Sequence, residues 1–161
     1  MTIAYIAIGS NLANPLLQVH IALNYIDKIP RTKRIATSDF YRTIPYGGHK
    51  QPDYLNAVIM LQTELSVEVL FNYIQQIELK QGRLRTKNKW QARNIDLDLL
   101  LFGNSTIHTK FLKIPHYDMH NRAFVLIPLI QLSPDLHLPD GRSIIFCMNN
   151  LDSTNIQYWN K

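Results

Sequence analysis

The sequence has only one cysteine, Cys147, among its 161 residues, so an intrachain disulfide is impossible. This excludes the disulfide-stapled scaffolds of small secreted proteins and favours a reducing compartment. The N-terminal apolar run has no basic segment before it and is too short for a signal peptide or a membrane span. We therefore expect a cytoplasmic protein with no membrane partner.

The chain also lacks low-complexity segments and internal linkers. Its hydrophobic share of 46% and charged share of 18% are those of an ordinary globular protein, which argues against wholesale disorder. We expect one domain spanning residues 1–161. The formal net charge of +5 indicates anionic partners, but so small an excess does not separate a nucleotide from a nucleic acid.

Acidic residues are missing between Glu78 and Asp96. Six cations lie in that segment instead: Lys80, Arg83, Arg85, Lys87, Lys89 and Arg93. Asp98 then follows Asp96 within a short hydrophobic run. Mobile cations beside fixed carboxylates suit a metal-bound polyphosphate, so the segment predicts nucleotide-dependent phosphoryl chemistry.

Hydrophobic periodicity predicts two strand–helix–strand units joined by a loop over residues 44–53. The first helix is expected to begin after Asn14 and to end near Pro30, and the second to run from Ser66 to Gly82. The strands are expected over residues 2–9, 34–43, 54–62 and 94–102. This order predicts an α+β fold with a ferredoxin-like (split βαβ) antiparallel sheet and helices packed on it, with a doubly wound parallel sheet as the alternative.

The region after Gly103 is less regular. A short helix over residues 122–132, interrupted or kinked at Pro128, is expected there, and then a final strand or helix.

Asp96 and Asp98 are two residues apart on a predicted strand, so their side chains should share a face, with Cα atoms roughly 6.5–7 Å apart. Two carboxylates at this spacing can hold one or two Mg²⁺ ions and leave coordination sites for phosphate oxygens. An exposed strand face with two solvated acids is the structural alternative. The neighbouring hydrophobic residues are expected to face the core: Ile95, Leu97, Leu99 and Leu101.

Three other interpretations remain open at this point. The cationic loop around Trp90 could bind nucleic acid, although the central strands lack the interleaved aromatics typical of such modules. The two carboxylates could serve a metal-dependent nuclease or nucleotidyl enzyme. His116, Asp118 and His120 could bind zinc, but no glutamate accompanies them as in hydrolytic zinc motifs, and His116 and Arg122 are better interpreted as phosphate donors.

Several motifs occur together over most of the chain: AYIAIGSNL, FYRTIPYG, QPDYLNAV, RNIDLDLLLFG and PHYDMHNRAFVL. In these the chain closely resembles the 6-hydroxymethyl-7,8-dihydropterin pyrophosphokinases of folate biosynthesis. The resemblance implies a monomeric α+β enzyme that transfers the pyrophosphoryl group of ATP, its co-substrate, to the pterin's hydroxymethyl group and releases AMP.

The resemblance also implies residue roles. Asp96 and Asp98 would hold two Mg²⁺ ions, Arg83 and Arg93 would act on the phosphates, and Glu78 would organise the site. ATP contacts would fall on Gln75, Arg85, Lys89, Trp90, Leu99, His116, Tyr117 and Arg122. Pterin contacts would fall on Thr43, Pro45, Tyr46, Tyr54, Asn56, Trp90 and Phe124.

The chain departs from the family pattern in its loops. Where the family commonly has Arg-Trp-Gly-Pro-Arg, this chain has Lys89-Trp90-Gln91-Ala92-Arg93, and lysine lacks the bidentate fork of arginine. Thr86 stands where some members carry a basic residue, and Ile44 replaces a common proline. We expect residues 82–93 to form a lid that folds over bound nucleotide.

Overall fold

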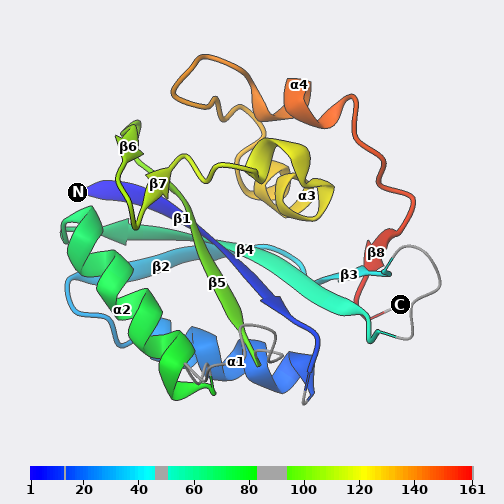
Figure 1. The fold of residues 1–161 in the computed structure, drawn as a ribbon, viewed down its shortest axis with the longest axis horizontal. Helices are drawn as coiled ribbons and strands as arrows, with labels where there is room; N and C mark the ends of the chain where they lie inside the picture. The colour runs from blue at the N-terminus through cyan, green and yellow to red at the C-terminus, as the bar shows by residue number, and fades with distance from the viewer. Residues whose placement is uncertain (13, 46–50, 83–93, 161) are drawn as a thin grey trace.

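The computed structural model describes residues 1–12, 14–45, 51–82 and 94–160. A six-stranded antiparallel sheet forms its centre, in the order β5-β1-β4-β3-β8, with β2 also pairing with β4 (Figure 1). The strands of this sheet are β1 (Thr2–Ser10), β2 (Thr32–Thr37), β3 (Tyr41–Thr43), β4 (Tyr54–Thr63), β5 (Asp96–Phe102) and β8 (Ile156–Tyr158). A separate hairpin consists of β6 (Ile107–His108) and β7 (Lys113–Ile114).

The helices lie on both faces of the sheet (Figure 1). Helices α1 (Pro15–Ile26) and α2 (Val67–Lys80) cover one face, and α3 (Ala123–Leu132) and the short α4 (Ile144–Met148) lie on the other, after a 3₁₀ turn, η2 (Met119–Asn121). The split βαβ prediction is confirmed, because β1 lies between β4 and β5 and antiparallel to both. No helix among the residues described is long and apolar enough to span a membrane.

Each face of the sheet has its own hydrophobic core. Alternate β1 residues such as Ile6 and Ile8 pack with Leu70 and Ile74 of α2 beneath the sheet. The opposite alternation packs against α3, and this second core contains Tyr5, Val58, Met119, Leu126 and Leu129. Because strand side chains alternate between faces, one short strand supplies both cores.

Local sequence signals fix the helix starts. Asn14 caps α1 by accepting a hydrogen bond from the Leu17 N–H, with Pro15 as the first helical residue. Ser66 caps α2 in the same way through the Val69 N–H. Gly82, with φ of 99°, follows the end of α2 in the left-handed region, as expected of a helix stop.

Two predicted boundaries are wrong. Helix α1 ends at Ile26 rather than near Pro30, and the chain continues through a turn in which the Ile29 N–H bonds to the Ile26 carbonyl. The single strand predicted over residues 34–43 is two strands, β2 and β3. Ser38 separates them because its Oγ accepts the Val58 N–H at 2.9 Å, replacing a backbone acceptor of the ladder.

Strand β5 also differs from the prediction. It begins at Asp96 rather than residue 94. In its pairing with β1, Leu99 lies opposite Ile6 and Leu101 opposite Tyr5, so Leu100 is an extra residue with no partner on β1. This bulge reverses the alternation, so Leu101 packs in the core under α3 and not with Leu97 and Leu99. Pro128 does not interrupt α3, which runs unbroken to Leu132.

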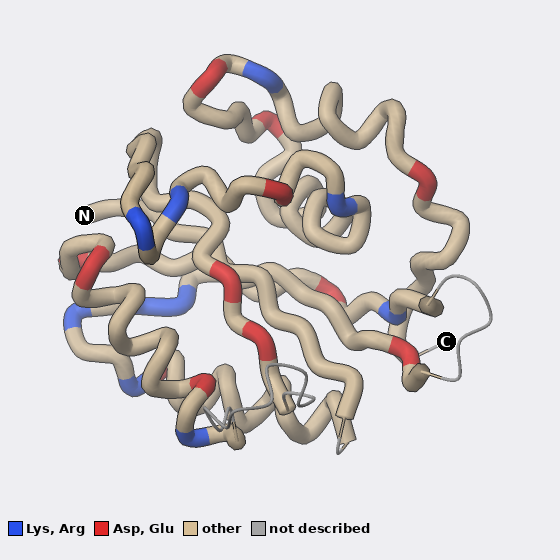
Figure 2. The backbone as a smooth tube through the Cα atoms, in the orientation of Figure 1, with Lys and Arg blue, Asp and Glu red and all other residues tan. Residues whose placement is uncertain are grey.

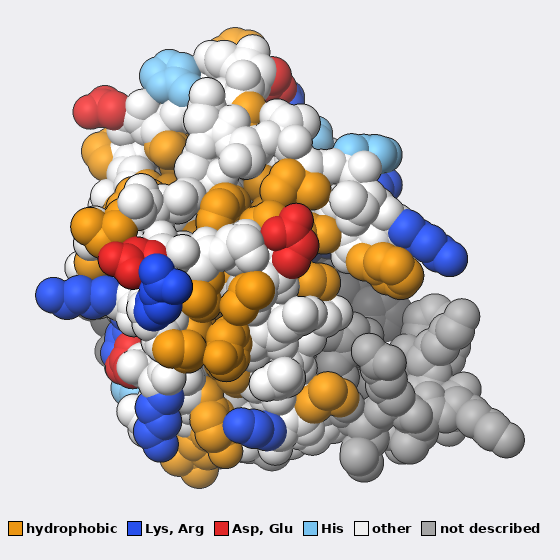
Figure 3. All heavy atoms as spheres, turned by 90° about the vertical axis from the view of Figure 1, so that its left-hand side faces the viewer, with side chains coloured by type: hydrophobic (Ala, Val, Ile, Leu, Met, Phe, Trp, Pro, Cys, Tyr) orange, Lys and Arg blue, Asp and Glu red, His pale blue; other side chains and the backbone are white. Residues whose placement is uncertain are grey.

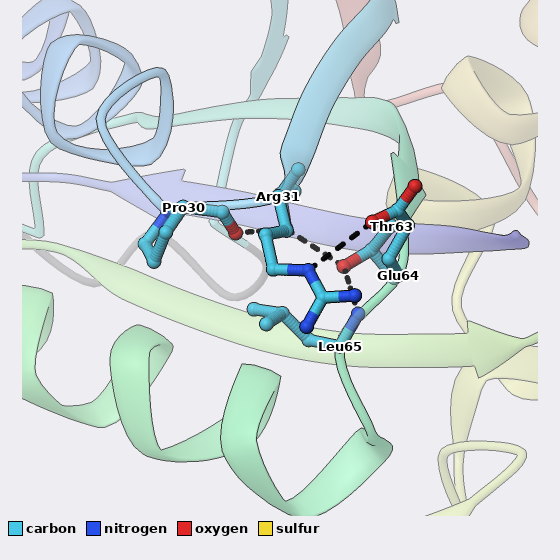
Figure 4. A network of polar contacts seen from close by, with 6 residues as sticks. Pro30, Arg31, Thr63, Glu64 and Leu65 are labelled. Carbon is cyan, nitrogen blue, oxygen red and sulfur yellow. Dashed lines mark hydrogen bonds and ion pairs between the residues drawn. The ribbon is translucent and has the colours of Figure 1, made fainter.

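A network of polar contacts holds the end of β4 that is remote from Tyr54 (Figure 4). Arg31, with φ of 55°, donates from Nε to Glu64 Oε2 at 3.1 Å, and the Glu64 N–H donates to the Arg31 carbonyl at 3.0 Å. These contacts join the α1–β2 turn to the β4–α2 turn. The candidate site lies at the opposite end of β4, the end that begins at Tyr54.

Candidate active site

The site forms on the α3 face, at the part of the sheet where β1 contributes only alanine and glycine. Gly9 of β1 lies opposite Asn56 of β4 on one side and opposite Asp96 of β5 on the other. Ala7 lies opposite Asp98 in the next same-facing row. With strands about 4.8 Å apart, the Cα atoms of Asp96 and Asn56 are separated by roughly 10 Å, with only glycine between them.

A cavity of about 320 Å³ stands over this floor. Its walls come from the ends of β4 and β5, from β3 and from the start of α3. The lining residues are Ala7, Ile8, Gly9, Thr43, Tyr54, Asn56, Ala57, Asp96, Asp98, Arg122, Phe124 and Val125. The structure thus brings together seven of the residues predicted from sequence, from four separate segments of the chain.

Asn56 is the buried polar group of the cavity, 7% exposed. Its Nδ2 donates to Thr43 Oγ1 at 2.7 Å, which fixes the amide plane. A Cβ added to Gly9 would lie 3.3 Å from Asn56 Oδ1, so this oxygen lies directly over the glycine. An oriented amide presents both a donor and an acceptor, which matches a heterocycle with an amide-like edge.

Tyr54 and Phe124 supply aromatic surface to the same cavity. Tyr54 lies opposite Thr43 in the β3–β4 pairing, and Phe124 lies in the first turn of α3. Burial, and secondarily the charge of Asp96, raises the pKa of the Tyr54 hydroxyl above its usual value. Tyr54 therefore stays protonated near neutral pH and presents an uncharged side chain to the cavity.

Asp96 and Asp98 line the β5 side of the cavity, as expected of residues on one face of the strand. Figure 2 shows the acidic positions along β5 in red, near the centre of the molecule. Between them the Leu97 N–H donates to Glu78 Oε2 at 3.0 Å, and Glu78 is only 4% exposed. Ser10 Oγ donates to the Asn94 carbonyl at 2.6 Å, two residues before Asp96. These contacts hold the backbone that carries both carboxylates.

Arg122 closes the third side of the cavity. Its Nε donates to Asp118 Oδ2 at 3.1 Å, and its Nη1 lies 3.9 Å from Asp98 Oδ2. Hydrogen bonds from the side chains of Asn121 and Arg122 hold the pKa of Asp118 below its usual value. The guanidinium is thus held over the cavity next to Asp98.

His116 lies beside Asp98 and stacks on Tyr117, with ring centroids 4.8 Å apart. Its Nδ1 accepts the Asp118 N–H at 3.2 Å, so the neutral ring carries its proton on Nε2. Burial lowers the pKa of His116 more than the charge of Asp98 raises it, and the net shift is downward. At neutral pH this side chain is an uncharged donor.

A second cavity, of about 340 Å³, adjoins the first at Asp98. Leu99, His116 and Tyr117, all predicted as ATP contacts, line it. The remaining lining residues are Phe71, Leu97, Lys110, Phe111, Leu112 and Lys113. Two adjoining cavities that share one carboxylate suit two substrates that react with each other.

The other predicted residues are placed as follows. Pro45 lines a third cavity, of about 310 Å³, which shares Thr43, Arg122 and Phe124 with the first. Gln75 precedes Glu78 by one turn on α2, so the two are neighbours on the helix surface. The predictions for Tyr46, Arg83, Arg85, Lys89, Trp90 and Arg93, and for the lid, concern residues outside those described.

The zinc alternative finds no support within residues 1–12, 14–45, 51–82 and 94–160. No cluster of three or more histidine, cysteine or acidic side chains suitable for a metal occurs among them. Asp118 is committed to Arg122 and Asn121, and the His116 Nδ1 to a backbone N–H.

Sequence reasoning missed four contributors. Ala7 and Gly9 form the floor, although the sequence predicts only a strand over residues 2–9 and no site residue there. Lys110 and Lys113 line the second cavity from the β6–β7 hairpin, a segment without a recognisable motif. The alternation of β1 could have revealed Ala7 and Gly9, since these two small residues are two positions apart and so share a face.

Comparison with known proteins gives a consistent result. The family model for 7,8-dihydro-6-hydroxymethylpterin-pyrophosphokinase (HPPK) matches residues 5–134. The chain is 49% identical over 144 residues to the 2-amino-4-hydroxy-6-hydroxymethyldihydropteridine pyrophosphokinase of Haemophilus influenzae, covering 89% of each protein. The Pseudomonas aeruginosa protein of the same name is 46% identical over 140 residues, covering 87% of this chain and 86% of its own.

The fold has solved counterparts. The chain of Plasmodium falciparum HPPK-DHPS crystallised with pteroate superposes with a TM-score of 0.75 at 16% identity, which is a likeness of fold alone. The match covers 98% of this chain and 47% of that longer one. The residues matched by the family model run from β1 through α3 and include the whole lining of the first cavity. The chain therefore belongs to the 7,8-dihydro-6-hydroxymethylpterin-pyrophosphokinase family.

Proposed function

We propose that this chain transfers the pyrophosphoryl group of ATP to the hydroxymethyl group of 6-hydroxymethyl-7,8-dihydropterin and releases AMP. The observation that carries the proposal is the first cavity. It combines an oriented amide, two aromatic rings and two carboxylates, with Gly9 between the amide and the carboxylates. Membership of the family and high identity to relatives named for this activity agree with it.

The pterin is proposed to lie over Gly9 between the rings of Tyr54 and Phe124. Asn56 would read its amide-like edge, because Thr43 holds the amide in one orientation. Ring faces stack favourably in offset geometry. The hydroxymethyl group would then point toward the β5 side, where Asp96 and Asp98 lie.

The site suits magnesium. The groups on β5 that could bind a metal are the carboxylate oxygens of Asp96 and Asp98. The Asp98 side chain is 42% exposed, so its carboxylate is open to ligands from outside the protein. Mg²⁺ commonly takes only one or two protein carboxylates and completes its coordination with water and phosphate oxygens. We propose that Asp96 and Asp98 hold two such ions, which would neutralise phosphate charge and lower the pKa of the attacking hydroxyl.

ATP is proposed to occupy the second cavity, with its phosphates toward Asp98. Arg122 and the Nε2–H of neutral His116 would donate to phosphate oxygens there. Leu99 and Tyr117 supply apolar surface beside them. Gln75, Arg85 and Lys89 are proposed as further ATP contacts, Pro45 and Tyr46 as pterin contacts, and Trp90 as a contact of both.

In the transfer, the pterin hydroxyl oxygen forms a bond to the β-phosphorus, and the bond from that phosphorus to the α,β-bridging oxygen breaks. AMP leaves with that oxygen, and the hydroxyl proton is lost to solvent. Such transfers depend on in-line positioning and charge stabilisation more than on a strong base. Arg83 and Arg93 are proposed to stabilise the phosphate charge that develops.

A nucleic-acid-binding module was the alternative function, and the comparisons give it no support. Figure 3 shows the face that carries α2 and the β6–β7 hairpin, with charges of both signs interspersed among apolar side chains. The cations described on that face form no continuous stripe of the kind that follows a phosphate backbone.

We also propose that the chain acts as a single-domain monomer in the cytoplasm. Its lone cysteine supports a reducing compartment. Size-exclusion chromatography with light scattering tests the monomer, which has a mass of 18.7 kDa.

The proposed activity is tested by incubating the protein with ATP, Mg²⁺ and 6-hydroxymethyl-7,8-dihydropterin and separating the products by chromatography. We expect AMP and a diphosphorylated pterin in equal amounts. ADP with a monophosphorylated pterin, or no product from folded protein, would contradict the proposal.

A further inference from the structure

The C-terminal segment returns to the sheet beside the candidate pterin site. Strand β8 pairs with β3, with Ile156 opposite Thr43 (Figure 1). Tyr158 stacks on Tyr41 with centroids 5.3 Å apart. This segment lies beyond residues 5–134, so the family match says nothing about it.

Asn155, just before β8, holds the residue that follows Thr43. Its carbonyl accepts the Ile44 N–H at 3.0 Å, and its Nδ2 donates to the Ile44 carbonyl at 2.9 Å. The Ile44 side chain is 43% exposed, so its own burial does little to fix this backbone. The two hydrogen bonds therefore carry much of the restraint on Ile44.

Ile44 connects this restraint to the pterin site. Its neighbour Thr43 accepts the hydrogen bond that orients the Asn56 amide, at 2.7 Å. Asn155 and Ile156 also line the third cavity, which shares Thr43 and Phe124 with the first. A displacement of the Ile44 backbone would thus move the acceptor that sets the Asn56 amide.

We propose that Asn155 is a positioning residue for pterin recognition. Its two hydrogen bonds fix the Ile44 backbone, so that Thr43 holds the Asn56 amide in the orientation that recognises the pterin. The inference rests on the proposed function, since it takes the first cavity as the pterin site. It assigns a role in substrate recognition to a C-terminal segment for which the sequence predicts only a final strand or helix.

The test uses Asn155→Asp, which keeps the shape of the side chain but removes its donor. We expect the Kd for 6-hydroxymethyl-7,8-dihydropterin, measured by fluorescence titration, to rise roughly three- to tenfold, the scale of one hydrogen bond. The Kd for a non-hydrolysable ATP analogue should stay within about twofold, because Asn155 makes no described contact with the second cavity. Asn155→Gln, which restores a donor, should recover part of the pterin affinity.

Asn150→Asp is the matched control, since it makes the same change of charge at an exposed position of the same segment. It should leave both affinities unchanged. A second readout is amide hydrogen exchange: the Ile44 N–H should exchange faster in Asn155→Asp, while the Leu61 N–H in the buried part of β4 should keep its protection. Should the aspartate variant not fold, Asn155→Ala, which also lacks the side-chain donor, takes its place in both readouts.

The outcomes separate the two hypotheses. Unchanged pterin affinity in Asn155→Asp, with a wild type that binds pterin, would overturn the positioning role and leave the proposed function standing. Equal losses of pterin and ATP affinity would also overturn it, because they would indicate a general structural role. A folded wild type that binds no pterin would overturn the proposed function itself.

Discussion

The buried carboxylate of Glu78 accepts a hydrogen bond at 3.0 Å from the backbone N–H of Leu97, the residue between the two site aspartates. Glu78 lies in the last turn of α2, so the contact joins that helix to the start of β5. The position of Asp96 and Asp98 is therefore coupled to the packing of α2.

Replacing Glu78 by alanine should destabilise the protein by about 1–3 kcal/mol, since it leaves a buried N–H without this acceptor. Urea unfolding measures the change. Glu64→Ala is the control, because Glu64 is half-exposed in its ion pair with Arg31 and should cost less than about 1 kcal/mol. Equal losses of unfolding free energy in the two variants would show that the Leu97–Glu78 hydrogen bond stabilises the protein no more than an exposed ion pair does.

Gly9→Ala should weaken pterin binding about tenfold or more. The new Cβ would lie 3.3 Å from Asn56 Oδ1, so either the amide or the substrate must move, and tight sites lose affinity steeply when displaced. Pterin titration and the KM for pterin measure the effect.

Gly141→Ala is the control for Gly9→Ala. A Cβ there meets nothing within 4 Å, but φ is 95°, so the variant should lose stability and keep pterin affinity. If Gly9→Ala bound pterin as the wild type does, the cavity floor would not be the pterin site.

The neutral state of His116 predicts a pH dependence of stability. Its folded-state pKa is below the unfolded value of 6.5, chiefly because of burial. The folded protein therefore binds fewer protons than the unfolded chain, and the stability that this contributes is full above pH 6.5 and is lost as pH falls below it.

Thermal melts of wild type and His116→Gln between pH 8 and pH 5 test this dependence. The wild-type Tm should fall more steeply below pH 6.5 than that of the variant, in which the titrating group is missing. Parallel curves for the two proteins would contradict the assignment of a neutral, buried imidazole.

Much of the site followed from sequence because its features are local. The alternation of a strand placed Asp96 and Asp98 on one face without knowledge of the fold. The family motifs then indicated Tyr54, Asn56 and Phe124, which the structure gathers into one cavity. The order of helices and strands sufficed for the split βαβ topology.

The features that sequence reasoning missed depend on contacts between distant segments. Ser38 breaks a predicted strand because its hydroxyl bonds to the backbone of β4, a partner 20 residues away. The bulge at Leu100 arises only in the pairing of β5 with β1. The hydrogen bond between Asn155 and Ile44 joins residues 111 positions apart, and nothing in either local sequence indicates it.

The most direct test of the central claim compares Asp98→Asn with the wild type in the reaction of ATP, Mg²⁺ and 6-hydroxymethyl-7,8-dihydropterin. Loss of the carboxylate should lower the rate of AMP release by at least about 10²–10³-fold, on the scale of removing one electrostatic group from a transition state. Asp135→Asn, at an exposed position remote from the cavities, is the control and should react at the wild-type rate. A folded Asp98→Asn protein that released AMP as fast as the wild type would contradict the claim that the carboxylates on β5 support the transfer.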